Sequence, residues 1–236
     1  MNKEFSQKMM AIRNRTVKEI VNFFKVEAIE AHILGSLAKG TNDALSDVDI
    51  WLTFEDEKMP TVLEKRMATY AQFGQIILLN EMPNNFPLNG VQTAVLYKIS
   101  GELLRVDFYL CPLSSSRILP GSKILFANKE VPVGSIIPET KKKPGNISDR
   151  ITFLISMCFI AIKKVVRKDP AFTDFLLSEF SKSEKDIPAL ATVPKAHTFD
   201  MIKKALAALE TVADPKQKTA IKEIDKFLTK IESLNL

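Results

Sequence analysis

Apolar positions near the start of the chain change from helical to strand spacing. Between Lys3 and Lys25 they recur at intervals of three and four, which predicts an amphipathic helix. An apolar run over 28–34 follows and ends at Gly35, as expected where a strand meets a helix. Residues 46–52 form the next strand-like run. The pattern therefore predicts a helix, a strand, a tight glycine turn with a short helix, and a second strand.

Further strands and one helix are predicted up to about residue 128. Ser100-Gly101 joins two strand-like runs and is a hairpin signal, whereas the prolines and asparagines of 81–89 indicate a loop. The predicted elements of this part are a helix over 60–73 and strands over 75–79, 91–100, 102–111 and 123–128.

From Ile147 onward the spacing is helical only. Residues 131–145 hold three prolines and the run Lys141-Lys142-Lys143, so they are the best candidate for a domain boundary. Ser148 or Asp149 is expected to cap the first helix. Its part over 151–162 is apolar nearly all round, which predicts a central buried helix. The four predicted helices cover 148–168, 170–180, 198–212 and 215–234.

These patterns together predict an α+β protein with two domains. Residues 1–145 are expected to form a mixed β-sheet with flanking helices, and residues 146–236 an all-α helical bundle with short connections. The exposed side of the apolar helix is one place where a homodimer could form.

Charge and cysteine content narrow the function. The chain of 236 residues has a net charge of +5 that is spread over both halves, so no concentrated basic surface for a nucleic-acid duplex is expected. A modest positive charge still suits an anionic nucleotide. Cys111 and Cys158 lie in apolar runs and are interpreted as buried free thiols of a reducing compartment.

Membrane insertion and export are not indicated. No apolar run reaches the roughly 18 residues that a membrane helix needs. The N-terminal sequence MNKEFSQKMM lacks the apolar core of a signal peptide. We therefore expect a cytoplasmic protein.

Candidate chemistry is concentrated between Ala31 and Leu52. Gly35 lacks a Cβ, so its backbone can lie close to a bulky ligand, and Ser36 offers a hydroxyl and a backbone amide to a phosphate. Asp47 and Asp49 are two residues apart in a predicted strand, so they share one face, roughly 7 Å apart along the chain. Two hard carboxylates facing a phosphate-binding turn suit a magnesium–nucleotide site.

Structural alternatives exist for each part of this stretch. A lone pair of aspartates is common on an exposed strand, and a lone Gly-Ser is a turn signal. Gly35 and Gly40, followed by Thr41, also have the spacing of a P-loop. The lysine that this loop needs is absent, so we reject that interpretation. The ordered combination of turn and carboxylates favours a binding site.

The two motifs resemble the signature of the DNA polymerase β-like nucleotidyltransferase superfamily. The similarity covers Gly35 to Thr41 and then Ser46 to Asp49, and is closest to small bacterial enzymes that include aminoglycoside and lincosamide nucleotidyltransferases. Lys39 stands where the family usually has arginine, which keeps the charge but not the planar fork. The resemblance also implies a third carboxylate on a later strand.

Asp107 is the candidate for this third carboxylate. It lies inside the predicted strand 102–111, on the same face as Arg105 and Tyr109, and acidic residues are otherwise disfavoured in strands. One alternative is a structural aspartate that pairs with Arg105 or faces solvent on an edge strand. The resemblance implies instead that Asp107 completes the metal site or acts as general base.

The resemblance implies a specific reaction and set of roles. A nucleoside monophosphate, most simply AMP from ATP, is transferred to a hydroxyl of a small molecule such as an aminoglycoside or lincosamide, and pyrophosphate is released. Two Mg²⁺ ions are expected on Asp47, Asp49 and Asp107. Gly35 and Ser36 are expected to bind the nucleotide phosphates, with help from Lys39.

Other assignments remain open at this level. The acceptor could instead be a partner protein or an RNA end, although the balanced charge disfavours RNA, or the domain could bind nucleotide without catalysis. Lys163 and Lys164 are either phosphate ligands or solvated helix-end residues. His32 is expected to be structural, and neither His32 nor His197 belongs to a metal-ligand spacing.

Overall fold

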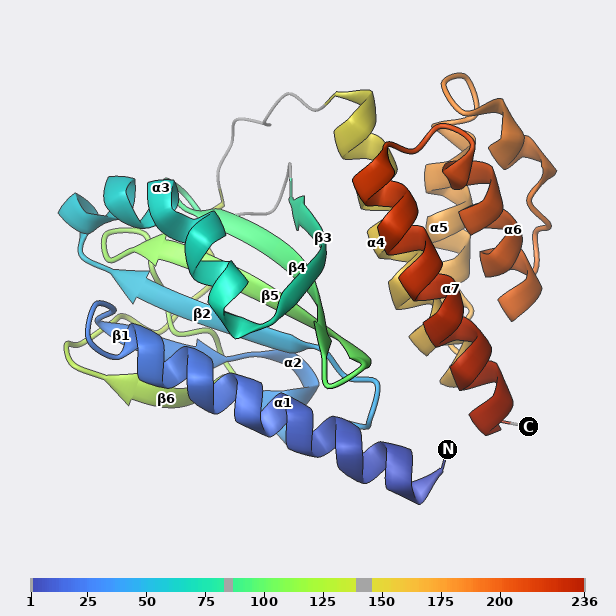
Figure 1. Ribbon diagram of the computed structural model, residues 1–236. Coiled ribbons are helices and arrows are strands. Elements are labelled where there is room, and N and C mark those ends of the chain that lie inside the picture. The colour runs from blue at the N-terminus through green and yellow to red at the C-terminus, as the bar shows by residue number, and fades with distance from the viewer. Residues whose placement is uncertain (1, 83–86, 139–145, 236) are drawn as a thin grey trace. The chain divides into compact units, whose positions relative to one another are not determined.

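The computed structural model describes residues 2–82, 87–138 and 146–235. The chain folds into two compact units, Lys3–Pro144 and a second one made mainly of Gly145–Leu236 (Figure 1). The lysine run 141–143 at the expected boundary lies outside the described residues. In the part of the chain that the structure describes, no helix is long and apolar enough to cross a membrane.

The first unit is built on a mixed sheet of six strands in the order β3-β4-β5-β2-β1-β6. Its central pair, β2 and β5, runs parallel, and every other neighbouring pair is antiparallel. The strands are β1 (Glu30–Ile33), β2 (Val48–Phe54), β3 (Gln75–Glu81), β4 (Val91–Ile99), β5 (Glu102–Pro112) and β6 (Lys123–Ala127).

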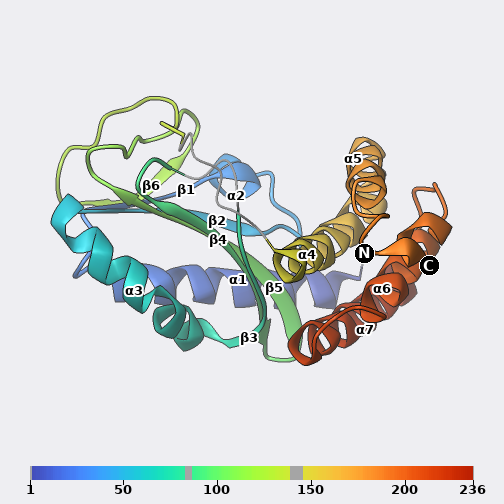
Figure 2. The same ribbon diagram turned by 90° about the horizontal axis from the view of Figure 1, so that it is seen from above.

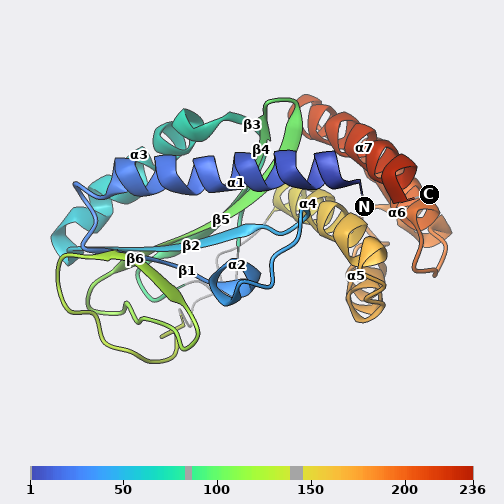
Figure 3. The same cartoon turned by 90° about the horizontal axis from the view of Figure 1, so that it is seen from below.

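Two helices cover one face of this sheet. Figure 2 shows α1 (Lys3–Phe24) and α3 (Met59–Tyr70) on one side of the strands and α2 (Gly35–Lys39) on the other, and Figure 3 shows the same division from below. Short 3₁₀ turns at Asp56–Lys58 and Ala71–Phe73 flank α3. The alternate residues Val48, Ile50, Leu52 and Phe54 of β2 are fully buried.

Aromatic packing fixes the helices to this face. The Phe108 ring of β5 stacks on Tyr70 at the end of α3, with centroids 4.4 Å apart. Phe24 at the end of α1 packs edge-on against Phe54 at 5.9 Å. Such pairs add to the area that they bury, so this side holds the hydrophobic core of the unit.

The hairpin between β4 and β5 forms at the predicted place. Ser100 and Gly101 both have positive φ, 53° and 82°, as a two-residue primed turn requires. The turn sets the register in which Ile99 pairs with Glu102. Because β5 lies between β4 and β2, the alternative of an edge strand for Asp107 is wrong.

The opposite face of the sheet carries a buried polar network. Glu30 and His32 are both fully buried and joined at 2.8 Å, and Glu30 also accepts a hydrogen bond from Thr53 at 2.9 Å. His32 stacks on Trp51 with ring centroids 5.7 Å apart. His32 therefore has the structural surroundings expected for it.

The second unit contains the four expected helices. They are α4 (Ile147–Val166), α5 (Ala171–Ser181), α6 (Phe199–Glu210) and α7 (Pro215–Asn235), with a 3₁₀ turn at Pro188–Thr192. Residues Ile151 to Ile162 of α4 are mostly buried, as the apolar pattern predicted. Cys158 in α4 and Cys111 in β5 are buried free thiols.

The first cap of this unit differs from the prediction. Asn146, rather than Ser148 or Asp149, is the N-cap of α4, and its side chain accepts a hydrogen bond from the Asp149 amide at 2.9 Å. The Asp149 carboxylate in turn accepts from the Asn146 amide at 3.1 Å. This reciprocal capping box satisfies two amides, which a cap further along the chain would leave open.

The aromatic core gives the first prediction. Phe108→Ala should lower the free energy of unfolding by about 3–5 kcal/mol, because it removes a fully buried ring and leaves a cavity beside Tyr70. Urea denaturation of both proteins measures the difference. The control Val26→Ala, at a side chain that is 87% exposed, should change stability by less than about 0.5 kcal/mol. Equal effects of the two substitutions would show that Phe108 is not part of the core.

Candidate active site

Two of the predicted aspartates lie side by side on the sheet. Asp49 of β2 pairs with Asp107 of β5 in the parallel ladder, and residues in register project from the same face. This is the face opposite α1 and α3, where Trp51 and Thr53 also lie. Asp49 is half-buried and Asp107 is buried. The register therefore forms a row of two carboxylates at the centre of the sheet.

Asp47 reaches this region from just outside the strand. It was predicted inside the strand, but β2 begins at Val48. Arg13 of α1, which is 1% exposed, donates hydrogen bonds to the backbone oxygens of Asp43 (2.7 Å) and Ser46 (3.0 Å). The Asp43 carboxylate also accepts from the Leu45 amide. These bonds fix the loop that delivers Asp47, and periodicity alone gave no sign of this role of Arg13.

The predicted glycine turn lies next to Asp49, at one end of the row of two carboxylates. Gly35 has φ +64°, and a Cβ placed on it would lie 2.7 Å from Oδ2 of Asp49. The Leu34 amide donates to the Asp49 backbone oxygen at 2.9 Å. The absence of a side chain at Gly35 thus makes room for the Asp49 carboxylate, a reason that differs from the predicted close approach of a ligand.

Ser36 and Lys39 follow Gly35 in the short helix α2. Ser36 is half-buried, and Lys39 is exposed in the last turn. The helix ends at Gly40, whose φ of 68° is left-handed. The structure therefore places Gly35 against Asp49, and carries Ser36 and Lys39 on the helical turn that follows it.

Arg105 supplies the positive charge of the row. Its guanidinium donates to both oxygens of Asp107, from Nε at 2.9 Å and from a terminal nitrogen at 3.1 Å, and the residue is 4% exposed. Burial alone would lower the pKa of Arg105, but the negative charges of Asp107, Asp47 and Asp49 raise it above its usual value. Arg105 is thus a permanent cation among three carboxylates. Its two-residue offset from Asp107 was the only signal in the sequence.

The carboxylates fit a divalent cation that arrives with a nucleotide. Among the described residues, no group of three or more His, Cys, Asp or Glu side chains is placed to hold a metal by itself. Mg²⁺ is commonly held by one or two carboxylates together with substrate phosphates and water, rather than by a cage of protein ligands. Asp47, Asp49 and Asp107 are carboxylates of the kind that such a cation uses, and Arg105 fixes the orientation of the Asp107 group.

The two lysines of α4 differ in their surroundings. Lys163 is 3% exposed, and its ammonium lies 4.7 Å from the centroid of the Phe159 ring. Lys164 donates to Asp169 at 2.6 Å. Neither is a simple solvated helix-end residue, and a phosphate contact of either one stays a prediction.

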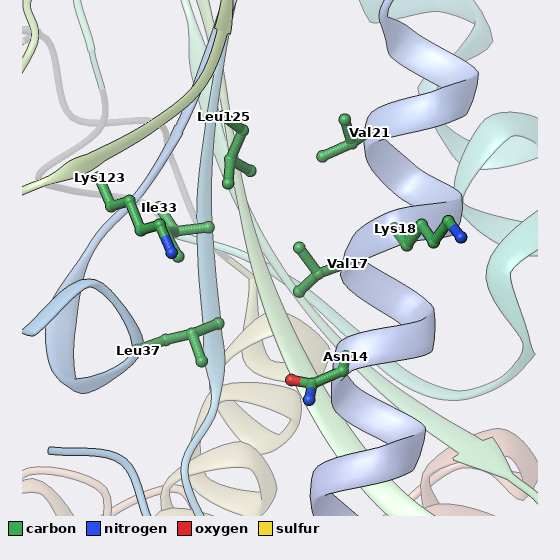
Figure 4. Close-up of a pocket in the computed structure, with 8 residues that line it drawn as sticks. All are labelled: Asn14, Val17, Lys18, Val21, Ile33, Leu37, Lys123 and Leu125. Carbon is green, nitrogen blue, oxygen red and sulfur yellow. The ribbon is translucent and has the colours of Figure 1, made fainter. Parts of the chain in front are cut away.

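A groove of about 360 Å³ lies away from the carboxylates. Figure 4 shows Val17 and Val21 of α1 facing Ile33 and Leu125 across it, with Leu37 of α2 at one end. Asn14, Lys18 and Lys123 complete its lining, which has no acidic residue. The groove therefore adjoins the glycine-turn helix but does not contain the candidate chemistry.

Comparison with known proteins identifies the domain. A family model described as "Nucleotidyltransferase domain" matches residues 14–86, a stretch that holds Gly35, Ser36, Asp47 and Asp49. Residues 14–86 are therefore a nucleotidyltransferase domain of the DNA polymerase β-like superfamily, and nucleotidyl transfer is the activity that this domain supports. The mixed sheet with flanking helices is the fold expected for that class.

More distant comparisons add little. No curated protein matches the chain in sequence. A solved structure with some similarity is the STING-associated CdnE c-di-GMP synthase from Capnocytophaga granulosa. The two are 13% identical, the comparison covers 97% of this chain and 83% of that one, and the TM-score is 0.33. A likeness this weak transfers neither substrate nor mechanism.

The contact between Gly35 and Asp49 gives the second prediction. Gly35→Ala should lower the rate of nucleotidyl transfer by about a hundredfold, because its methyl group displaces the Asp49 carboxylate. The matched control is Gly40→Ala, at nearly the same φ but with nothing within 4 Å of the added methyl group. Both variants carry about 1–2 kcal/mol of backbone strain, so urea denaturation should show similar stabilities. Equal losses of transfer would mean that the Asp49 contact is unimportant.

The buried ion pair gives the third prediction. Arg105→Met should lower the free energy of unfolding by about 3–5 kcal/mol, because it leaves Asp107 buried without its counter-ion. Lys203→Met breaks the half-exposed pair with Glu232 and should cost less than about 1 kcal/mol. In the double variant Arg105→Met with Asp107→Leu, much of the loss should be recovered. A double variant no more stable than Arg105→Met would contradict the pairing.

Proposed function

We propose that the chain transfers a nucleoside monophosphate from a nucleoside triphosphate, ATP being the expected one, to a hydroxyl of a small molecule. An aminoglycoside or a lincosamide is the expected class of acceptor. The observation that carries the proposal is the pairing of Asp49 with Asp107 on one face, directly against the Gly35 turn. The nucleotidyltransferase domain assigned to residues 14–86 supports the reaction class.

In this proposal the glycine turn and the carboxylates have different roles. The backbone after Gly35 and the Ser36 hydroxyl bind the terminal phosphates, and Lys39 at the end of α2 contributes positive charge. Asp47 and Asp49 are the carboxylates that would hold a cation beside the α-phosphate. The acceptor oxygen then bonds to the α-phosphorus, the bond from that phosphorus to the bridging oxygen breaks, and pyrophosphate leaves with its electron pair.

Two Mg²⁺ ions belong to the proposal. When bound, they would activate the acceptor hydroxyl and stabilise charge on the leaving pyrophosphate. Asp47 and Asp49 are the residues that would hold them with the nucleotide phosphates, and Asp107 would complete the set.

The proposal also includes a group that can accept the proton of the acceptor hydroxyl. A carboxylate has about four lone-pair sites, and Arg105 uses one on each oxygen of Asp107. In the proposal Arg105 fixes the orientation of the Asp107 carboxylate, and this carboxylate accepts the proton or binds a cation. This arrangement suits Asp107 as general base or as third ligand, the two roles that the family resemblance implies.

The two domains have separate roles in the proposal. Residues 1–145 form the catalytic domain, and residues 146–236 form the helical domain that is expected to contribute to acceptor selection. The compactness of each unit supports this division.

The fourth prediction tests the carboxylate assignment. Asp49→Asn should abolish Mg²⁺-dependent release of pyrophosphate from ATP, because the amide cannot provide the negative charge that the cation needs. Thermal unfolding of Asp49→Asn should match that of the wild-type protein. Asp200→Asn, at an exposed side chain of α6, is the control and should release pyrophosphate normally. Normal turnover by Asp49→Asn would exclude the proposed site.

A further inference from the structure

The ladder position of Asp49 and Asp107 can be followed beyond Asp107 onto the next two strands, β4 and β3. In register with Asp107 lies Ala94 of β4, and in register with Ala94 lies Asn80 of β3. These side chains share the face of Asp49 and Asp107, because neighbouring residues in a ladder project from the same side. The glycine turn is at the other end of the row, next to Asp49. The glycine turn, which follows β1, and Asn80 of β3 are thus separated by β2, β5 and β4.

Asn80 is a buried amide with one weak hydrogen bond among the described residues. It is 4% exposed, and within the described residues its side chain makes one hydrogen bond, from Nδ2 to the Met82 sulfur at 3.6 Å. A thioether is a weak acceptor, and an asparagine side chain offers two donors and two acceptor sites. Buried amides are ordinarily well bonded, so this one is left with capacity for a ligand.

The next pair on this face of the sheet, two residues along each strand from Ala94 and Asp107, consists of Gln92 and Tyr109. Gln92 of β4 pairs with Tyr109 of β5, and its amide donates to the Tyr109 hydroxyl at 2.9 Å. The Tyr109 ring stacks on Trp51, with centroids 5.3 Å apart and planes at 14°, so its position is fixed. Tyr109 is partly buried.

The Tyr109 hydroxyl is therefore arranged as a donor. It already accepts from Gln92, so its own proton is directed elsewhere, and within the described residues it makes no second hydrogen bond. Burial, together with the charges of Asp107 and Asp49, raises the pKa of Tyr109 above its usual value. The phenol consequently stays protonated throughout the neutral range.

The polar cluster suits an acceptor better than a triphosphate. Asn80, Gln92 and Tyr109 are uncharged, and the neighbouring guanidinium of Arg105 is already bonded to Asp107. Polyanionic phosphates call for cations or a turn of free amides, whereas a sugar-like molecule calls for neutral donors and acceptors. The nearby aspartates also favour a neutral or cationic molecule over an RNA end.

We propose that Asn80, Gln92 and Tyr109 form the acceptor subsite, which takes a neutral or cationic polyhydroxylated molecule on the β4 side of Asp107. This inference rests on the proposed nucleotidyl transfer. Tyr109 donates to one hydroxyl oxygen of the acceptor, and the Asn80 amide binds a second. An adjacent hydroxyl is then presented to Asp107 and to the α-phosphorus.

The test compares two tyrosines that differ in the face they occupy. Tyr109→Phe and the control Tyr97→Phe each remove one hydroxyl with one hydrogen bond; the Tyr97 hydroxyl donates to the Tyr70 backbone oxygen on the helix-covered face. The probes are kanamycin and lincomycin with ATP and Mg²⁺. Tyr109→Phe should raise the KM for the drug about tenfold with little change in kcat, as expected for one lost hydrogen bond. Tyr97→Phe should leave this KM unchanged.

Direct binding separates the outcomes. The Kd for ATP should be the same in wild type, Tyr109→Phe and Asn80→Leu, whereas drug binding measured by calorimetry should weaken in both variants. A weakened ATP affinity in Tyr109→Phe, equal effects of the two tyrosine substitutions, or no binding of either drug would overturn the acceptor subsite. Absence of Mg²⁺-dependent pyrophosphate release by the wild-type protein would instead reject the proposed function itself.

Discussion

The parallel pairing of β2 with β5 is the constraint on which the site depends. It sets Asp49 opposite Asp107, two residues that are far apart in sequence, and it does so in the centre of the sheet. A slip of one residue would put Val106 or Phe108 opposite Asp49 and turn Asp107 into the aromatic core. The packing of the hydrophobic face thus fixes the register that pairs Asp49 with Asp107 on the other face. Phe108 cannot leave its place beside Tyr70 without moving the neighbouring Asp107.

The same pairing creates an electrostatic cost that Arg105 offsets. Carboxylates gathered in a partly buried row repel one another, and desolvation disfavours their charged forms. Arg105 lies on β5, two residues before Asp107 and on the same face, so the strand that brings one carboxylate also brings its counter-ion. Arg13 serves the backbone in a similar way, since it holds the loop before Asp47 from the neighbouring helix. Charged groups from a helix and two strands therefore build the site together.

Much of this arrangement could be predicted from the sequence. The hairpin at Ser100-Gly101, the order of helices and strands and the identity of the carboxylate strands follow from local rules of periodicity and turn chemistry. The register between β2 and β5 does not, because parallel strands are joined by long crossovers and no local signal fixes their alignment. The contact of Gly35 with Asp49 could not be predicted for the same reason. Its missing Cβ makes room for Asp49, which only the folded sheet brings close.

The buried polar residues were the least accessible to sequence reasoning. Asn80, Gln92 and Arg13 lie in segments whose apolar neighbours determine the pattern, so a polar side chain there looks like an interruption. The role of such a residue depends on which face of its element it occupies and on the side chains that lie next to it in the folded structure. Arg105 was visible as a neighbour of Asp107, but its closeness to Asp47 and Asp49 required the parallel pair.

The fate of the α-phosphate tests the central claim most directly. The protein is incubated with Mg²⁺, an acceptor panel and ATP labelled at either the α- or the γ-phosphate, and the products are separated and identified by mass spectrometry. Our account predicts that the α-label moves to the acceptor as a nucleoside monophosphate and that the γ-label leaves in pyrophosphate. Transfer of the γ-label to the acceptor, with ADP as the second product, would contradict it.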